Sequence, residues 1–193
     1  MKANTFMNRI PRPIFAALVI ALFIAFATME SEAQVQAKLQ AAIFVKLLNY
    51  DSSLAQKPQS QLKFHIVIDA KTSPGQDAIK KEFAVISRQK ISGKNIIILI
   101  TPVGELATAN SEESTHVFYL PDGSTRATLN AAVQLGAQHK IPVLAGNAVL
   151  AVGGAAVGIT VSNGKPQIIV NLKQSKSMGM NLSSQLLKLA KVI

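Results

Sequence analysis

The spacing of apolar residues changes repeatedly between two periods along residues 35–145. Segments with every second residue apolar, or with all residues apolar, predict strands, and apolar residues three and four apart predict amphipathic helices. Proline and glycine residues separate these segments, as after Ile100 and Leu120. The predicted strands cover 62–68, 95–100, 115–120 and 142–144. The predicted helices cover 35–49, 73–89 and 124–139. The segment 147–152 fits either a helical turn or a loop.

Two of these elements carry more detailed expectations. The segment 95–100, in which every residue after Asn95 is apolar, predicts a strand that is buried on both faces. Ser124 stands at the start of a predicted helix, where its hydroxyl is suited to accept a hydrogen bond from the first turn. We therefore expect Ser124 to be the N-cap of that helix.

The last forty-odd residues form the most distinctive pattern in the chain. Gly153 and Gly154 precede an apolar segment, and Asn163-Gly164 separates it from a second one over 166–172. Asn-Gly between two such segments predicts a tight hairpin, because both central residues of the turn adopt positive φ. A leucine-rich segment over 182–193 then predicts a final helix with a broad apolar stripe.

The alternation of strand and helix predicts the fold class. Parallel strands joined by right-handed helical crossovers give a sheet with helices on both faces, a Rossmann- or flavodoxin-like layering. The closing hairpin adds antiparallel strands, so we expect a mixed, mostly parallel sheet. Residues 34–193 show no internal repeat and no long linker. They therefore predict one α/β domain that ends in a β-hairpin and a C-terminal helix.

Residues 1–33 have the pattern of a signal peptide. Three basic residues precede an uncharged run of 16 residues over 14–29, and Ser31-Glu32-Ala33 offers small residues at a cleavage site. The run is shorter than the roughly 20 residues that a membrane-spanning helix prefers. We expect cleavage near Ala33 and a periplasmic mature chain, with an uncleaved signal anchor as the alternative.

The composition excludes several classes of function. The chain contains no cysteine, so it has no disulfide, no thiolate nucleophile and no cysteine-ligated metal. Its hydrophobic content of 49% and charged content of 16% argue against disorder. An exported chain with two tyrosines and no tryptophan is also a poor candidate for binding nucleic acid.

The net charge of the whole chain is +10. The signal segment carries three basic and two acidic residues, so residues 34–193 keep a net charge of +9. This excess is consistent with attraction to an anionic partner, ligand or membrane surface. A solvated coat of scattered lysines also accounts for this excess, and we favour that interpretation.

Four polar residues follow predicted strands, at the edge where open α/β sheets bind ligands. They suggest a rim for a small-molecule pocket, although strand ends and turns need the same residue types. We favour core packing for the final helix. A partner-binding face is the alternative, and the methionines just before that helix support it, because methionine adapts to varied partners. The candidate rim is Asp69, Thr101, Asp122 and Asn147, and the candidate partner face is Met178 and Met180.

No catalytic or metal-binding pattern occurs in the chain. His65, His116 and His139 lack the spacing of a metal site, and no G-x-S-x-G segment is present. We expect structural roles for all three histidines. The chain is therefore not expected to be an enzyme, to bind a metal or to require a cofactor.

The segments described above resemble, in order and spacing, the YfiR-like family (DUF4154). The likeness is specific at the C-terminal block, GGAAVGITVSNGKPQIIVNL with the leucine-rich segment after it, and moderate at the first helix, QAAIF through LNY. FHIVIDA and AAVQLGAQHKIPVLAG match the pattern more loosely. Many members have Trp-Pro after the first helix where this chain has Tyr50-Asp51. Redox control through disulfides, known in some members, does not transfer to a chain without cysteine.

The resemblance implies a periplasmic regulator. Such a protein binds the periplasmic domain of an inner-membrane sensor, typically a diguanylate cyclase, and holds it inactive. Release would raise cyclic-di-GMP and favour biofilm formation. A homodimer is compatible with this role, and membrane contact is expected only through the partner or an uncleaved signal. The alternative is a periplasmic module that binds a small anion or solute and serves a transporter or sensor.

Overall fold

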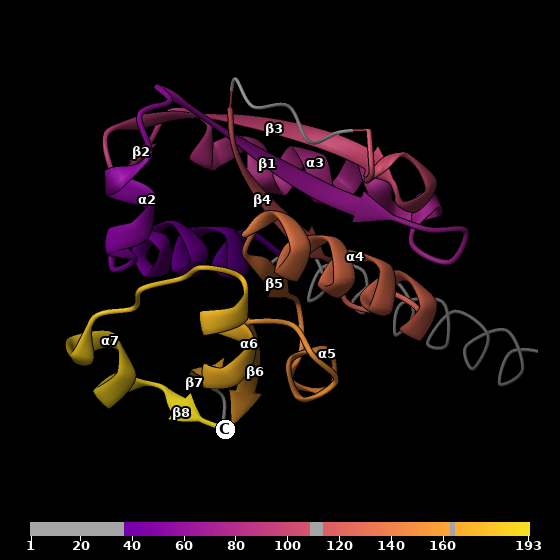
Figure 1. Cartoon of the computed structure of the whole chain (residues 1–193). Helices are drawn as coiled ribbons and strands as arrows, with labels where there is room; N and C mark the ends of the chain where they lie inside the picture. Colours follow the sequence, from indigo (N-terminus) through magenta and orange to yellow (C-terminus); the bar gives the residue numbers. More distant parts are fainter. Residues whose placement is uncertain (1–36, 109–113, 163–164) are drawn as a thin grey trace, which may run out of the picture. The chain divides into compact units, whose positions relative to one another are not determined.

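The computed structural model describes residues 37–108, 114–162 and 165–193 (Figure 1). The predicted signal peptide at 1–33 and the predicted turn at Asn163-Gly164 lie outside these residues. None of the helices in the described ranges is long and apolar enough to cross a membrane.

The described chain forms an eight-stranded sheet in the order β2-β3-β1-β4-β5-β6-β7-β8. The strands are β1 (Gln61–Ile68), β2 (Lys90–Ile91), β3 (Lys94–Pro102), β4 (Thr115–Leu120), β5 (Val143–Ala145), β6 (Val157–Ser162), β7 (Lys165–Val170) and β8 (Lys191–Val192). The helices are a first helix over 37–49, α2 (Ser52–Gln56), α3 (Gln76–Phe83), α4 (Arg126–His139), α5 (Ala148–Val152), α6 (Leu172–Ser177) and α7 (Ser184–Leu189), with 3₁₀ turns at Ser73–Gly75, Ala84–Ile86 and Val103–Glu105.

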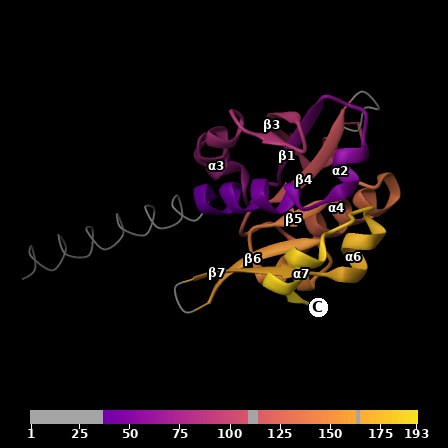
Figure 2. The same cartoon turned by 90° about the vertical axis from the view of Figure 1, so that its left-hand side faces the viewer.

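Five neighbouring strands of this sheet are parallel, in the order β3-β1-β4-β5-β6. Ranked by their position in the chain, these strands follow the order 2-1-3-4-5 of flavodoxin-like folds. β2 is antiparallel to β3, and β7 is antiparallel to β6, beside which it runs in Figure 2. The predicted mixed, mostly parallel α/β sheet is therefore confirmed.

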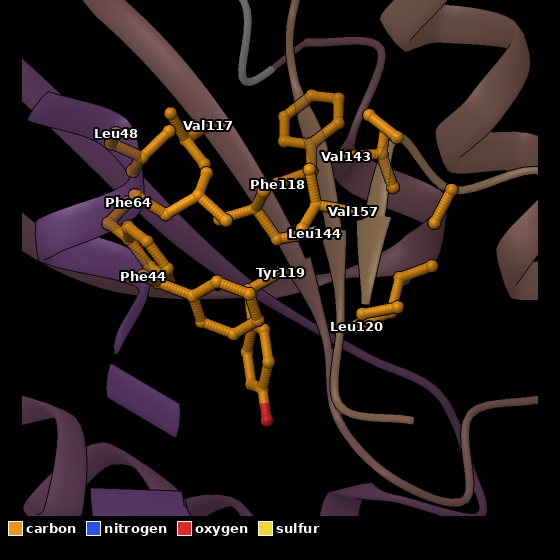
Figure 3. Packing of buried hydrophobic residues seen from close by; sticks show 14 of the residues in the cluster. Phe44, Leu48, Phe64, Val117, Phe118, Tyr119, Leu120, Val143, Leu144 and Val157 are labelled. Atoms are coloured by element: carbon orange, nitrogen blue, oxygen red, sulfur yellow. The ribbon is translucent and has the colours of Figure 1, made fainter. Parts of the chain in front are cut away.

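One face of the central strands packs against the first helix and α3. Phe44 of the first helix, Phe83 of α3 and Phe64 of β1 surround Tyr119 of β4, with ring centroids 4.6 to 6.1 Å from that of Tyr119. Figure 3 shows Phe44, Phe64 and Tyr119 together in the core. Burial of these rings removes large apolar areas from water and joins helices and sheet into one core.

The opposite face is covered unevenly. α4 packs on β4 and β5, and its Gly136 lies so close to Val143 that an added Cβ would be 2.8 Å from the Val143 side chain. Farther along this face, Ile97 and Leu99 of β3 are only partly buried. The prediction that 95–100 would be buried on both faces is therefore wrong for these residues. An apolar run reports hydrophobicity and does not reveal which neighbours will cover a strand.

The predicted helix over 182–193 is also wrong in part. α7 covers only Ser184–Leu189, and Ala190 is extended, with φ −99° and ψ 155°. The next two residues form β8, which pairs in parallel with Ile169 and Val170 of β7. A helix of six residues has little stability of its own, so pairing with an open strand edge decides the conformation here.

Three further elements differ from the sequence predictions in detail. The side chain that caps α4 belongs to Thr125, whereas the Ser124 hydroxyl donates to the Pro121 carbonyl. The helix predicted over 73–89 is a short α3 flanked by 3₁₀ turns. The ambiguous segment 147–152 forms α5, which Asn147 caps.

Candidate functional site

The candidate rim residues lie in three separate groups of hydrogen bonds. The first is centred on Asp69, directly after β1. One carboxylate oxygen, Oδ1, accepts hydrogen bonds from the backbone of Lys71 and Thr72, both at 3.0 Å. The other oxygen, Oδ2, accepts from the Thr125 backbone N–H at 2.9 Å and from the Thr128 hydroxyl at 2.5 Å. Asp69 thus connects the end of β1 to the start of α4.

The Asp69 carboxylate occupies a position that ligands often take in this fold. The chain reverses its direction of winding between β1 and β4, and flavodoxin-like proteins bind ligands at that point. Helix N-termini there attract anions. In this chain the Asp69 carboxylate itself occupies the position that a bound ligand takes in those proteins. Burial by itself would raise the pKa of Asp69, but the hydrogen bonds from Thr128, Thr125 and Thr72 outweigh it and hold that pKa well below its usual range.

The second group joins Asp122 and Asn147, which follow β4 and β5. The Asn147 side-chain amide donates to Oδ1 of Asp122, and its carbonyl oxygen accepts from the Leu150 backbone N–H at 2.9 Å. These contacts hold the start of α5 against the loop after β4. Each rim residue in this group therefore has an internal structural partner.

Beneath this group lies a buried hydrogen-bond chain that the sequence analysis missed. The Tyr119 hydroxyl donates to Gln40 Oε1 at 2.6 Å, and Gln40 Nε2 donates to the Gly146 carbonyl at 3.0 Å. Burial, and secondarily the charge of Asp122, raises the pKa of Tyr119 well above its usual range, so the phenol stays neutral. A Cβ at Gly146 would come within 2.8 Å of the Asp122 backbone nitrogen. The carboxyl ends of β4 and β5 are consequently filled from within the chain.

The third group contains Thr101 and two buried histidines on the face opposite to the first helix. His65 of β1 is 1% exposed and His116 of β4 is 3% exposed. His65 Nε2 lies 2.9 Å from His116 Nδ1, and His65 Nδ1 lies 2.9 Å from the Thr101 hydroxyl oxygen. The ring centroids are 5.1 Å apart with planes inclined by 25°, so the facing nitrogens lie close to the line between the centroids. This is the geometry of an N–H···N hydrogen bond.

The hydrogen bonds restrict the protonation of the histidine pair. Only one hydrogen fits between the two facing nitrogens, so the rings cannot both be protonated while the bond persists. Burial, the charge of His116 and the ammonium group of Lys63 together lower the pKa of His65 from 6.5 to about 4. His65 is therefore neutral near pH 7.

A cleft of about 350 Å³ opens beside His65 of this pair. Of the four rim residues, only Thr101 lines it. Its walls combine apolar surface from β3 with one ammonium and one carboxylate group. The lining residues are Lys63, His65, Leu99, Ile100, Thr101, Glu105 and Thr108.

The structure does not bring the predicted rim together into one site. Asp69, the Asp122–Asn147 pair and Thr101 share no hydrogen-bond partner in the described ranges. The meeting of His65 and His116 depends on the register of β1 and β4, which no local sequence signal reveals. Within the described residues, no three His, Cys, Asp or Glu side chains converge in a way that could hold a metal ion.

Met178 and Met180, the candidate partner face, are buried residues in this structure. Their side chains are 0% and 5% exposed and belong to the hydrophobic core. The sulfur of Met178 lies against Gly136 of α4. Both residues follow the short helix α6, which folds back toward the sheet instead of leading into a long final helix.

Asp51 is a second polar residue whose role the sequence analysis missed. Its side chain is fully buried, and Oδ1 accepts hydrogen bonds from the backbone of Ser53 and of Asn181. Its Oδ2 is buried and has no hydrogen-bond partner among the residues that the structure describes. Asp51 thus links the end of the first helix to the segment before α7.

Comparison with known proteins identifies a family. The sequence profile of the YfiR/HmsC-like family, DUF4154, matches residues 37–191, which confirms the resemblance described above. No curated protein matches the chain significantly.

Two solved structures share the fold at low sequence identity. The first is an ABC domain in complex with L-Trp from Streptococcus pneumonia, with 14% identity and a TM-score of 0.52 over 81% of this chain and 62% of that chain. The second is a conserved domain protein from Vibrio cholerae, with 12% identity and a TM-score of 0.54 over 81% of this chain and 59% of that chain. The present chain thus spans about three-fifths of the length of each. At these identities the likeness concerns the fold alone.

We expect Asp69→Asn to destabilise the fold by about 1–3 kcal/mol, because an amide cannot accept all the hydrogen bonds that the carboxylate accepts. The native carboxyl has a lowered pKa, so its contribution is present above the ordinary value near 3.9 and is lost as the pH falls below it. Urea unfolding at several pH values measures both effects. Asp77→Asn, in the exposed first turn of α3, is the matched control and should cost no more than about 1 kcal/mol. Equal costs for the two variants would contradict the role of Asp69.

We also expect acid to destabilise the fold through His65. The folded pKa of about 4 lies below the ordinary value of 6.5, so the unfolded chain binds a proton that the folded chain excludes. Stability should therefore fall between about pH 6.5 and about pH 4, by about 3 kcal/mol from this residue. His65→Gln should flatten the curve of unfolding free energy in that window, and His139→Gln, at an exposed helix end, is the matched control. Parallel curves for the native protein and His65→Gln would refute this prediction.

Proposed function

This chain belongs to the YfiR/HmsC-like family, and we propose that it is an exported regulator that binds and restrains the periplasmic domain of an inner-membrane signalling protein. The expected partner is a diguanylate cyclase, whose release would raise cyclic-di-GMP and favour biofilm formation. The family match over residues 37–191 is the observation that carries this proposal.

Regulation of this kind requires no chemical step. The regulator stabilises the inactive state of its partner if it binds that state more tightly than the active one. The internal hydrogen bonds of Asp69, Asn147 and Gln40 support such a role, because these buried and half-buried polar groups serve the fold itself. The molecule then acts through its surface.

Export is part of the proposal. The signal pattern over residues 1–33 would deliver residues 34–193 to the periplasm, where the domain of the membrane partner lies. The match to the family begins at residue 37, just after the predicted cleavage site. The residues that match the family would thus lie in the part of the chain that follows the cleavage site.

The regulator is tested by deletion of its gene and by recovery of its partner. We expect deletion to raise cellular cyclic-di-GMP and surface attachment, and affinity-tagged protein to recover an inner-membrane protein with a periplasmic domain. Complementation should restore the native level. Leu18→Glu with Ile20→Glu interrupts the apolar run of the signal and should abolish complementation without changing residues 34–193. An unchanged cyclic-di-GMP level together with recovery of no membrane protein would exclude the proposal.

A second function is favoured by the cleft beside His65. A small anionic solute could contact Lys63 and Thr101 there, while its apolar part packs on Leu99. Phosphate, nucleotides and amino acids at about 100 times their dissociation constant should each add roughly 2.7 kcal/mol to stability if bound. Thermal unfolding detects this shift, and Thr101→Val should reduce it whereas Asp122→Asn should not. A flat response to all three classes would eliminate the solute-binding function.

A further inference from the structure

The acidic and basic residues of the chain are distributed very unequally. Residues 123–193 contain seven lysine and arginine residues and no aspartate or glutamate. All eight acidic residues of 34–193 lie between Asp51 and Asp122. If the lysines were scattered evenly, acidic residues would accompany them throughout the chain. The C-terminal segment instead has a net positive charge with no acidic side chain to offset it.

The fold keeps this segment together. It supplies everything from α4 to β8, drawn in orange to yellow in Figure 1. β8 pairs with β7 and packs against α7, and the Leu172 backbone N–H donates to the Ile193 carbonyl. The elements around β8 therefore come from the part of the chain that lacks carboxylate side chains.

Exposed apolar side chains accompany the lysines at this edge of the domain. Leu189 is 73% exposed, and Val192 and Ile193 are each 43% exposed. Neighbouring lysines on α6, α7 and β8 are also exposed. We name this surface the basic–apolar edge; it consists of Lys173, Lys188, Leu189, Lys191, Val192 and Ile193.

The residue types of the edge favour a lipid surface over a protein partner. The buried centres of protein interfaces are depleted in lysine and enriched in aromatic residues, methionine and arginine. The basic–apolar edge contains none of the enriched types. Lysine ammonium groups bind lipid phosphates, and aliphatic side chains between them enter the boundary between headgroups and acyl chains. Flexible lysine stems allow both contacts at once.

We propose that the basic–apolar edge binds the surface of an anionic phospholipid bilayer. The edge would then hold the exported chain at a membrane and raise its local concentration near membrane proteins. This contact is additional to the membrane contact expected from the sequence, which involved only a partner or an uncleaved signal. It does not depend on the identity of any protein partner.

Residues 34–193 are suited to a direct test, because they contain the whole described core but lack the apolar run at 14–29. Sedimentation with vesicles of about 30% phosphatidylglycerol in phosphatidylcholine should show binding that weakens as salt increases, and pure phosphatidylcholine should bind little. Replacement of Lys173, Lys188 and Lys191 by Gln should reduce affinity about fivefold per lysine, roughly a hundredfold in all. Leu189→Ser should also reduce it while leaving the net charge unchanged.

The control replaces three exposed lysines of the other half, Lys38, Lys80 and Lys81, by Gln. This variant has the same net charge as the first, so it should bind nearly as well as the native chain if the edge is the site. Thermal unfolding of each variant verifies that it is folded. Equal losses in the two triple variants, binding that ignores phosphatidylglycerol, or no binding at low salt would each overturn the proposal. Binding of a partner's soluble periplasmic domain without lipid is a separate measurement and tests only the regulatory function.

Discussion

The carboxylate of Asp69 determines how the carboxyl edge of the sheet is organised. It lies where the winding of the chain reverses, and it accepts hydrogen bonds from the loop after β1 and from the first turn of α4. A half-buried carboxylate is stable only with such partners. Since the partners belong to two elements that are distant in sequence, the same bonds hold those elements in register. The place that many α/β proteins reserve for a ligand is thereby closed.

Because internal hydrogen bonds occupy the carboxyl edge of the sheet at Asp69, binding is more favourable at other surfaces of the domain. The Asp122–Asn147 pair and the Gln40–Tyr119 chain satisfy the remaining polar groups near the ends of β4 and β5. The cleft beside the histidine pair and the outer surface of the domain are open to solvent in the described structure. Both suit a protein that acts by binding. Charge is distributed unequally over that surface, because only one half of the domain carries aspartate and glutamate side chains to offset its lysines.

The local sequence patterns predicted the strands well and the contacts between them poorly. β1 and β4 were recognised almost to the residue, because alternation and bounding prolines depend only on neighbouring positions. The approach of His65 to His116 depends on strand register, and the burial of Met178 depends on the short helix before it and on α4 behind it. Neither the pairing of strands nor the packing of helices is encoded in the spacing of a single segment. Each candidate rim residue accordingly follows a strand, but in the described structure the four residues belong to three separate groups of hydrogen bonds.

Apolar periodicity and turn residues were sufficient to predict an α/β domain with a mostly parallel sheet, because these signals act over a few neighbouring positions. The end of the chain shows the opposite case. Residues 182–193 have the composition of a helix, yet the last of them pair with the edge of β7. An unpaired strand edge offers hydrogen-bond partners that a short helix end cannot match, and that edge exists only after the sheet has formed. The last residues of the chain therefore pair with β7 in the assembled fold, although their local sequence favours a helix.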